Sequence, residues 1–176
     1  MIIDFFKNVA NLKKIQRKGW TDKLSMKNPE SVADHSYSMA IMGMIISDME
    51  NYNSEKIIKM ILLHDLAESE IGDFTPGEIS LEKKKELENN AFFKILASLP
   101  NNLKSQYQML WNDYQGNDSQ ESKIVHQIDR LEMTLQAKIY LNEGHSEEKI
   151  SLFFESAKKE IDHPKLKELF TKIINE

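Results

Sequence analysis

Apolar residues recur at intervals of three and four along most of the chain, and the N-terminal segment shows the pattern well: Ile2, Phe5, Phe6, Val9, Leu12 and Ile15. This spacing places the apolar side chains on one face of a helix. Only six Gly and four Pro occur in 176 residues, and no segment alternates apolar and polar residues as a strand does. No repeat or low-complexity linker divides the chain. The sequence therefore predicts one all-α domain, a helical bundle over residues 1–176.

Turn and capping residues divide the pattern into successive helices. The first helix is expected to close near Arg17, because Lys18-Gly19 follows and Gly is favoured just past a helix end. Gly72 is expected to stop a helix that begins at Ser54 and continues to Glu70. The remaining helices are expected at about 29–50, 81–98, 102–114 and 119–141, with two more starting at Ser146 and Pro164.

The composition excludes several kinds of protein. The formal charge is −5 and no basic stripe is present, so a nucleic-acid polymer is not an expected partner. The longest apolar or small run, Met39–Ile46, is far shorter than the roughly 20 residues that span a bilayer. No signal-peptide pattern occurs at the N-terminus. Cys is absent, which excludes thiolate nucleophiles and Cys-ligated zinc. We expect a cytoplasmic protein without membrane attachment, in which any metal binds to His and carboxylate ligands.

A His-Asp doublet interrupts one of the most apolar helices. His64 and Asp65 directly follow Met60–Leu63 and precede Leu66. Burying an ionised carboxylate without compensation costs several kcal/mol, so Asp65 is expected to be paired, hydrogen-bonded or bound to a metal. Glu68 is four residues after His64, and we therefore expect it to line the same pocket.

Two further helices carry similar polar residues among apolar ones. His35 precedes a long apolar run, and Asp129 lies among Val125, Ile128 and Met133. Together with His64 and Asp65 they form a mixed nitrogen and oxygen ligand set, which suits Mn, Co, Fe, Zn or Mg. From the residues alone, two alternatives stay open: a hydrogen-bonded core histidine, and an exposed Asp129-Arg130 pair.

The motifs around these residues are more specific than the doublet. The sequence resembles the HD-domain superfamily, and within it the 5′-deoxynucleotidase branch, over most of its length. The segments that carry the resemblance are RKGW at 17–20, PESVADHS at 29–36, HDLAE at 64–68 followed by GD at 72–73, and QID at 127–129 followed by EM at 132–133. The resemblance implies an HD-type helical bundle that uses one divalent metal ion to remove phosphate from deoxyribonucleoside 5′-monophosphates, and it implies a homodimer.

The resemblance also implies a role for each matching residue. The metal ligands would be His35, His64, Asp65 and Asp129. Glu68 would activate the attacking water, and Asp73 would hold the 3′-hydroxyl of the sugar. Trp20 would crowd the 2′ position and so select deoxyribose, although an aromatic residue after a helix also commonly packs on the core. Either Arg17 or Lys18 would bind the phosphate, because Lys18-Gly19 separates Arg17 from Trp20.

Two other functions are compatible with the same metal ligands. The first is an HD-type hydrolase of a cyclic phosphodiester or a nucleoside triphosphate. The second is a non-catalytic binding module that a structural ion stabilises. Glu68 and Asp73 favour an enzyme, because a structural site does not require uncoordinated acids at its rim.

Overall fold

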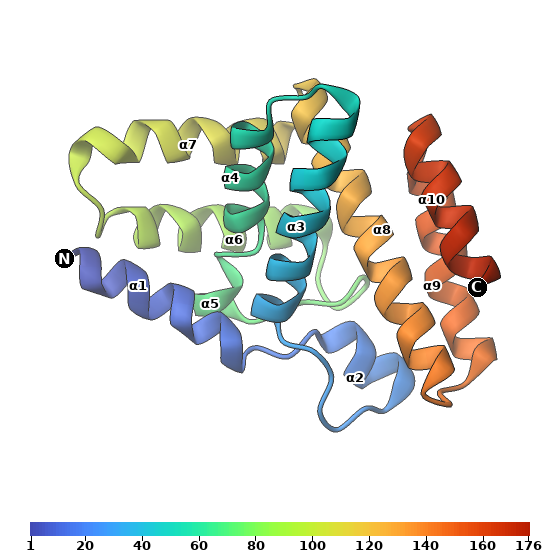
Figure 1. The fold of residues 1–176 in the computed structure, drawn as a ribbon. Helices are drawn as coiled ribbons and strands as arrows, with labels where there is room; N and C mark the ends of the chain where they lie inside the picture. The colour runs from blue at the N-terminus through green and yellow to red at the C-terminus, as the bar shows by residue number, and fades with distance from the viewer.

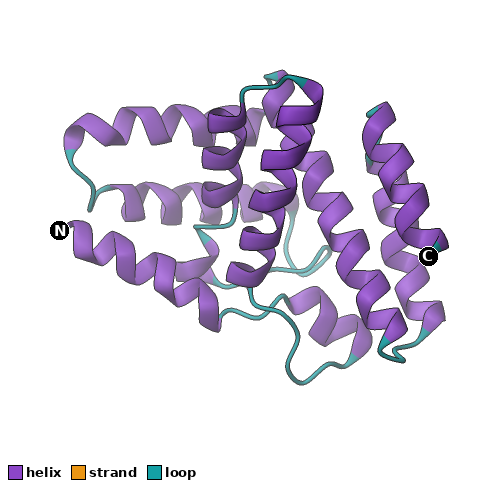
Figure 2. Cartoon of the chain, in the orientation of Figure 1, coloured by secondary structure: helices purple, strands orange, loops and turns teal.

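The computed structural model describes residues 1–176 and contains helices but no strands (Figures 1 and 2). The all-α prediction is therefore confirmed. None of the helices has the length and apolar character that crossing a membrane requires. In chain order the elements are α1 Ile2–Asn11, the 3-10 turn Leu12–Lys14, α2 Lys18–Leu24, α3 Val32–Glu50, α4 Ser54–His64, α5 Glu68–Ile71, α6 Leu81–Leu96, α7 Asn101–Gly116, α8 Gln120–Asn142, α9 Glu147–Glu160 and α10 Pro164–Asn175.

Three helices, α3, α4 and α8, form the centre of the bundle. The helix α3 packs on both α4 and α8, and α8 packs in turn on α9 and α10, which lie on the right in Figure 1. One hydrophobic core fills this part of the molecule and contains Met39, Ile57 and Ile128. A second core lies between α1, α5, α6 and α7, where Trp111 stacks on Phe92 with 4.0 Å between ring centroids. The metal-ligand candidates lie on the central three helices or directly after them.

The start of α3 is fixed by a capping box. The backbone N–H of Asp34 donates to Oγ of Ser31, and the Asp34 carboxylate accepts from the backbone N–H of Ser31. These bonds satisfy donors that have no partner inside the helix. The cap therefore fixes the first turn of α3, which carries His35. Ser119 caps the start of α8, where its Oγ accepts from the backbone N–H of Ser122, and the predicted helix at about 119–141 begins at the same point.

The first predicted helix ends earlier than expected. The helix α1 ends at Asn11, and after a 3-10 turn the chain is extended at Ile15 and Arg17. Lys18-Gly19 does not terminate a helix but begins α2, so this prediction was wrong. The reason is tertiary: the backbone of Ile15 and Arg17 pairs with the segment before α3, through Val32 N–H to Ile15 O and Arg17 N–H to Glu30 O.

The predicted helix from Ser54 to Glu70 is broken at the His-Asp doublet. The helix α4 ends at His64, and Asp65 has a backbone conformation of φ −105° and ψ 10°. A turn follows before the short helix α5 begins at Glu68, and Gly72 ends α5 with φ +78°. The break turns Asp65 out of the helical register, so that Asp65 and His64 approach the same point.

Gly43 allows α3 and α4 to pack closely. A Cβ at this position would overlap the Cδ1 atom of Ile61 and lie 3.2 Å from Cγ2 of Ile57. Both isoleucines are fully buried, so they have little room to move. We expect Gly43→Ala to lower the free energy of unfolding by about 1–2 kcal/mol, because overpacking outweighs the better helix propensity of Ala. Denaturant titration measures this loss, and removal of Cδ1 in a Gly43→Ala/Ile61→Val double variant should restore part of it.

Candidate metal centre

The four predicted metal ligands converge on one point. His35 lies in the first turns of α3, His64 ends α4, Asp65 follows it, and Asp129 lies in the middle of α8. Ligand atoms of His35, His64 and Asp129 all lie within 4.8 Å of one another. Asp65 Oδ2 is 3.0 Å from His64 Nε2, and Asp129 Oδ1 is 3.3 Å from His35 Nε2. Residues more than 90 positions apart in the sequence thus share one small volume.

The atoms that face this point have no hydrogen-bond partner. They are His35 Nε2, His64 Nε2, Asp65 Oδ2 and Asp129 Oδ1, and all four are buried. Buried polar atoms are nearly always satisfied in native proteins, because leaving them unpaired is costly. A divalent cation would satisfy all four at once, and two imidazole nitrogens with two carboxylate oxygens are a suitable ligand set for one. The residues therefore fit the metal ion that the sequence implies.

Both histidines are oriented with Nε2 toward the cluster. Nδ1 of His35 lies 2.5 Å from Oε2 of Glu132, and Nδ1 of His64 lies 2.6 Å from the carbonyl oxygen of Ile61. A carbonyl or carboxylate oxygen accepts, so Nδ1 donates in each ring and the lone pair of Nε2 is left for a metal. Sequence reasoning gave Glu132 no role. Its signal was a carboxylate between Leu131 and Met133, three residues after Asp129.

Glu132 offers a direct test of this orientation. We expect Glu132→Gln to weaken metal binding by about 10- to 100-fold, because the carboxylate that orients and polarises His35 is lost. Isothermal titration of the metal-free protein with Mn²⁺ or Co²⁺ measures the change. Glu143→Gln, at the exposed end of the same helix, is the matched control and should bind metal like the unmodified protein. Equal affinity for the two variants would contradict the role of Glu132.

The charges in the cluster perturb one another strongly. Burial and Arg17 act to lower the pKa of His35, but the nearby carboxylates of Asp129 and Glu132 outweigh them and raise it to about 9. Burial acts to raise the pKa of Asp65, but His64, Arg17 and His35 hold it below its usual range. A cation that binds here thus meets an ionised carboxylate and competes with a proton for His35.

Glu68 differs from the other acids of the cluster. Its side chain is 4% exposed, and its Oε2 atom is buried without a hydrogen-bond partner. Burial raises the pKa of Glu68 well above its usual value, and the charges of Asp65 and Asp73 add to this. A buried carboxyl with a raised pKa beside a metal-ligand cluster is typical of a general acid or base.

A cavity of about 460 Å³ opens beside the cluster and is lined by the metal-ligand candidates His64, Asp65 and Asp129. Arg17 and Glu68 also line it. Arg17 Nη1 lies 3.5 Å from Asp65 Oδ2, so the guanidinium is at the edge of the cluster. The backbone pairing of Arg17 with Glu30 fixes this position. Lys18, the alternative phosphate ligand, does not line the cavity, and its ammonium pairs with Glu78.

Asp73 and Trp20 both line the cavity and are held in place by other contacts. Oδ2 of Asp73 accepts a hydrogen bond of 2.7 Å from the backbone N–H of Lys18, at the start of α2. The Trp20 indole is 2% exposed, packs on Phe153, and donates a 2.8 Å hydrogen bond to Glu30. Trp20 therefore packs on the core and also lines the cavity, although sequence reasoning gave these as two separate possibilities.

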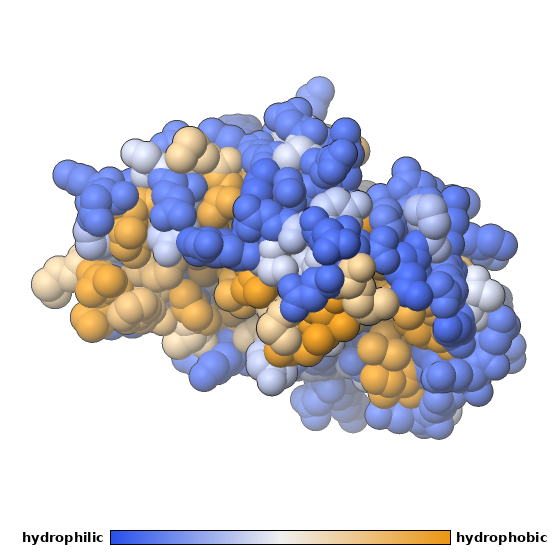
Figure 3. All heavy atoms as spheres, turned by 45° about the horizontal axis from the view of Figure 1, so that its top comes forward, coloured by the Kyte–Doolittle hydropathy of each residue, from blue (hydrophilic) through white to orange (hydrophobic).

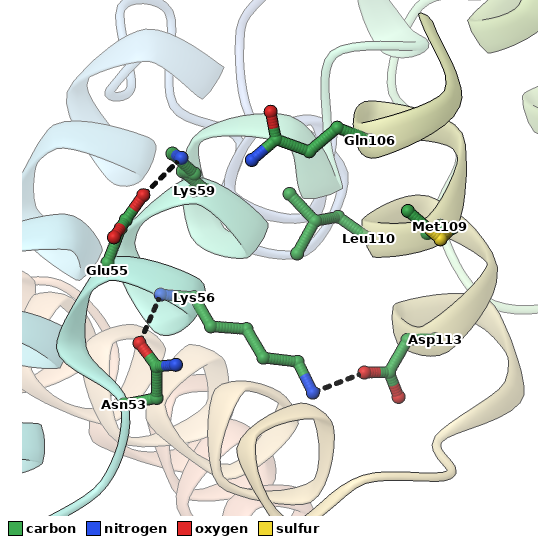
Figure 4. A pocket seen from close by; sticks show the side chains of 8 residues that line it. All are labelled: Asn53, Glu55, Lys56, Lys59, Gln106, Met109, Leu110 and Asp113. Atoms are coloured by element: carbon green, nitrogen blue, oxygen red, sulfur yellow. Dashed lines mark hydrogen bonds and ion pairs between the residues drawn. The ribbon is translucent and has the colours of Figure 1, made fainter. Parts of the chain in front are cut away.

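A second cavity, of about 360 Å³, lies between α4 and α7 (Figure 4). Its charged side chains pair with one another: Lys56 with Asp113 at 2.7 Å, and Lys59 with Glu55 at 2.5 Å. It contains no group of converging His and carboxylate ligands. The chemistry therefore points to the cavity beside the His-Asp cluster.

Comparison with known proteins identifies the family of the chain. The family model described as HD domain matches residues 9–169. The human protein named 5′-deoxynucleotidase HDDC2 is 34% identical over 98% of this chain and 84% of its own length. A Dictyostelium discoideum protein of the same name is 39% identical over 95% of this chain and 93% of its own length.

A solved structure supports the fold independently. A protein from Pyrococcus horikoshii has a TM-score of 0.76 and 29% identity, and the alignment covers 98% of this chain and 96% of that one. The family match spans the segment from α1 to α10 and includes every residue of the cluster. The chain belongs to the HD-domain family.

Proposed function

We propose that this protein is a metal-dependent 5′-deoxynucleotidase, which removes phosphate from deoxyribonucleoside 5′-monophosphates. The observation that carries the proposal is the set of four buried, unpaired ligand atoms beside a cavity that also contains Arg17 and Glu68. Relatives that align with nearly the whole chain have the name 5′-deoxynucleotidase. A small nucleotide is the proposed partner, and a nucleic-acid polymer is not.

His35, His64, Asp65 and Asp129 would hold one divalent ion, which is Co, Mn, Mg, Fe or Zn. When bound, such an ion polarises a phosphoryl oxygen and makes a water molecule more acidic. Arg17 would bind the phosphate, because its guanidinium is a forked donor that matches non-bridging oxygens. Its position in the cavity favours Arg17 over Lys18 for this role.

Glu68 would accept the proton of the attacking water at Oε2, the atom that has no partner in the protein. A pKa above the ordinary value of a carboxyl makes Glu68 a stronger base than a free glutamate. Asp73 would accept a hydrogen bond from the 3′-hydroxyl of the sugar through the capacity that the Lys18 amide leaves free. The buried Trp20 would form a rigid wall against a 2′-hydroxyl.

We further propose a cytoplasmic homodimer. Exposed apolar side chains follow one face of α3, and others lie on α1: Tyr37, Ile41, Ile45, Met49, Ile3 and Phe6. Apolar surface is visible near the N-terminus and across the centre of the molecule in Figure 3. Contiguous exposed apolar side chains commonly mark protein contacts, and a second copy of the chain is the proposed partner. Sedimentation equilibrium tests the dimer.

Phosphate release from purified protein tests the function. The substrates are matched deoxyribo- and ribonucleoside 5′- and 3′-monophosphates, with a cyclic nucleotide and a nucleoside triphosphate as alternatives. Each is assayed with Co²⁺, Mn²⁺, Mg²⁺ and Zn²⁺. The proposal requires turnover of deoxyribonucleoside 5′-monophosphates above all others. Preferred hydrolysis of the cyclic nucleotide or the triphosphate assigns another HD-type reaction, and no turnover of any nucleotide favours a binding module.

The role of Trp20 is testable with a conservative change. Trp20→Ala would remove a fully buried side chain and cost about 3–5 kcal/mol, which would confound the assay. Trp20→Phe keeps an aromatic ring against Phe153 but shortens the wall of the cavity. We expect it to reduce the preference for deoxyribose about tenfold, measured as the ratio of kcat/KM values, because steric discrimination of one small group has about this size. An unchanged ratio would remove Trp20 from sugar selection.

A further inference from the structure

Tyr114 is an aromatic residue of the cavity wall to which sequence reasoning gave no role. It lies near the C-terminal end of α7 and lines the cavity beside the metal centre. Its ring stacks on His126, with 4.3 Å between centroids and 16° between planes, and presents an edge-on contact to His64 at 5.8 Å. The ring is therefore fixed from two sides next to a metal-ligand candidate.

The hydroxyl of Tyr114 has no partner in the protein. The backbone carbonyl oxygen of Tyr114 accepts a hydrogen bond from Nε2 of His126, whereas the hydroxyl makes none. The hydroxyl is also not among the buried atoms without a partner. A tyrosine hydroxyl is protonated at neutral pH, since its ordinary pKa is about 10. The fixed ring thus presents an unused O–H donor to the cavity.

The charges of the cavity make a neutral donor valuable there. Asp65, Glu68, Asp73 and Asp129 all line it, and any carboxylate that the metal does not compensate would repel a dianionic phosphate. The ammonium of Lys84, another possible donor, already lies 3.3 Å from the Phe74 carbonyl oxygen and near Glu88. The Tyr114 hydroxyl, in contrast, has no hydrogen-bond partner in the protein.

We propose that Tyr114 donates its hydroxyl hydrogen bond to a non-bridging oxygen of the substrate phosphate. Arg17 approaches the same cavity from the start of α2, and α2 and α7 lie at opposite ends of the bundle in Figure 1. A phosphate in this cavity would then accept from one cationic donor and one neutral donor. This inference rests on the proposed function, because it requires a phosphate monoester in the cavity.

Tyr114→Phe tests the inference, because it removes the hydroxyl and keeps the stacked ring. We expect kcat/KM for a deoxyribonucleoside 5′-monophosphate to fall about 10- to 100-fold, as for the loss of one hydrogen bond to a charged group. Inhibition by inorganic phosphate should weaken by a similar factor, whereas inhibition by the product deoxynucleoside should not change. Tyr107→Phe, on the same helix but outside the cavity, is the matched control.

Two outcomes for the Tyr114→Phe variant would count against the proposal. Unchanged phosphate inhibition in Tyr114→Phe means that the residue only packs. Weakened inhibition by the deoxynucleoside alone moves the contact to the sugar or the base. Binding of inorganic phosphate to the metal-loaded protein, measured by calorimetry, separates this inference from the proposed function. If the protein binds phosphate through Tyr114 but hydrolyses no nucleotide, only the proposed function fails.

A measurement on protein that retains Tyr114 tests the proposal even if the Tyr114→Phe variant does not fold. Of the five tyrosines, Tyr114 is the one that lines this cavity. In protein labelled with 3-fluorotyrosine, addition of inorganic phosphate should therefore shift one ¹⁹F resonance. No shift at a phosphate concentration that inhibits the enzyme would overturn the proposal.

Discussion

Asp65→Ala should abolish phosphate release, with a fall in kcat/KM of at least about 1000-fold, because metal ions supply several kcal/mol of transition-state stabilisation. This substitution removes a carboxylate that makes two contacts. It lies 3.0 Å from His64 Nε2 as part of the ligand cluster, and it lies 3.5 Å from the guanidinium of Arg17. Its removal therefore weakens the metal site and also removes the ion pair that holds Arg17, the residue that we propose binds the phosphate.

The melting temperature with and without metal gives a second measurement of the site. Added metal raises the melting temperature of the unmodified protein, because a ligand that binds only the folded state stabilises it. In Asp65→Ala this increase should largely disappear. Asp118→Ala, at an exposed residue between α7 and α8, should keep both the activity and the increase. Phosphatase activity retained by Asp65→Ala under the same metal conditions would refute the assignment of the site.

The residues of the candidate cluster could be singled out in the sequence because His and Asp stand out in apolar helices, and the resemblance to the HD-domain superfamily supplied their proposed roles as metal ligands. His64-Asp65 after Met60–Leu63, and Asp129 beside Ile128, carry a burial cost that needs a compensating partner. The structure places their free atoms together with His35 Nε2. Helix ends that have a local cap could also be predicted, and Ser119 at the start of α8 is an example.

Features that depend on distant contacts could not be predicted in this way. The break after His64 occurs in a segment whose local pattern continues through Leu66 as a helix, and only the contacts of Asp65 across the bundle favour the break. The extended backbone at Arg17 exists because it pairs with Glu30. The role of Glu132 follows only from the fold, which places its carboxylate beside His35, a residue 97 positions away in the sequence.

Glu68→Gln should reduce kcat by about 10² to 10⁴, the usual contribution of a positioned general base. The amide has nearly the same shape as the carboxyl but cannot accept the proton of the attacking water. The side chain is 4% exposed and burial raises its pKa, which means that this position favours an uncharged side chain more than water does. We therefore expect the variant to fold with unchanged or slightly higher stability, and to bind metal in the same stoichiometry.

Metal content distinguishes the possible roles of Glu68. Glu70→Gln is the matched control, because Glu70 lies on the same short helix but is exposed and pairs with Lys94 at 2.5 Å. Stopped-flow or steady-state kinetics, with metal analysis of each variant, should give a low kcat with full metal content for Glu68→Gln alone. Loss of metal together with activity would make Glu68 a ligand rather than a base. A kcat within a few-fold of the control would show that water activation does not depend on this residue, and the proton would then have to be accepted by another group of the cavity.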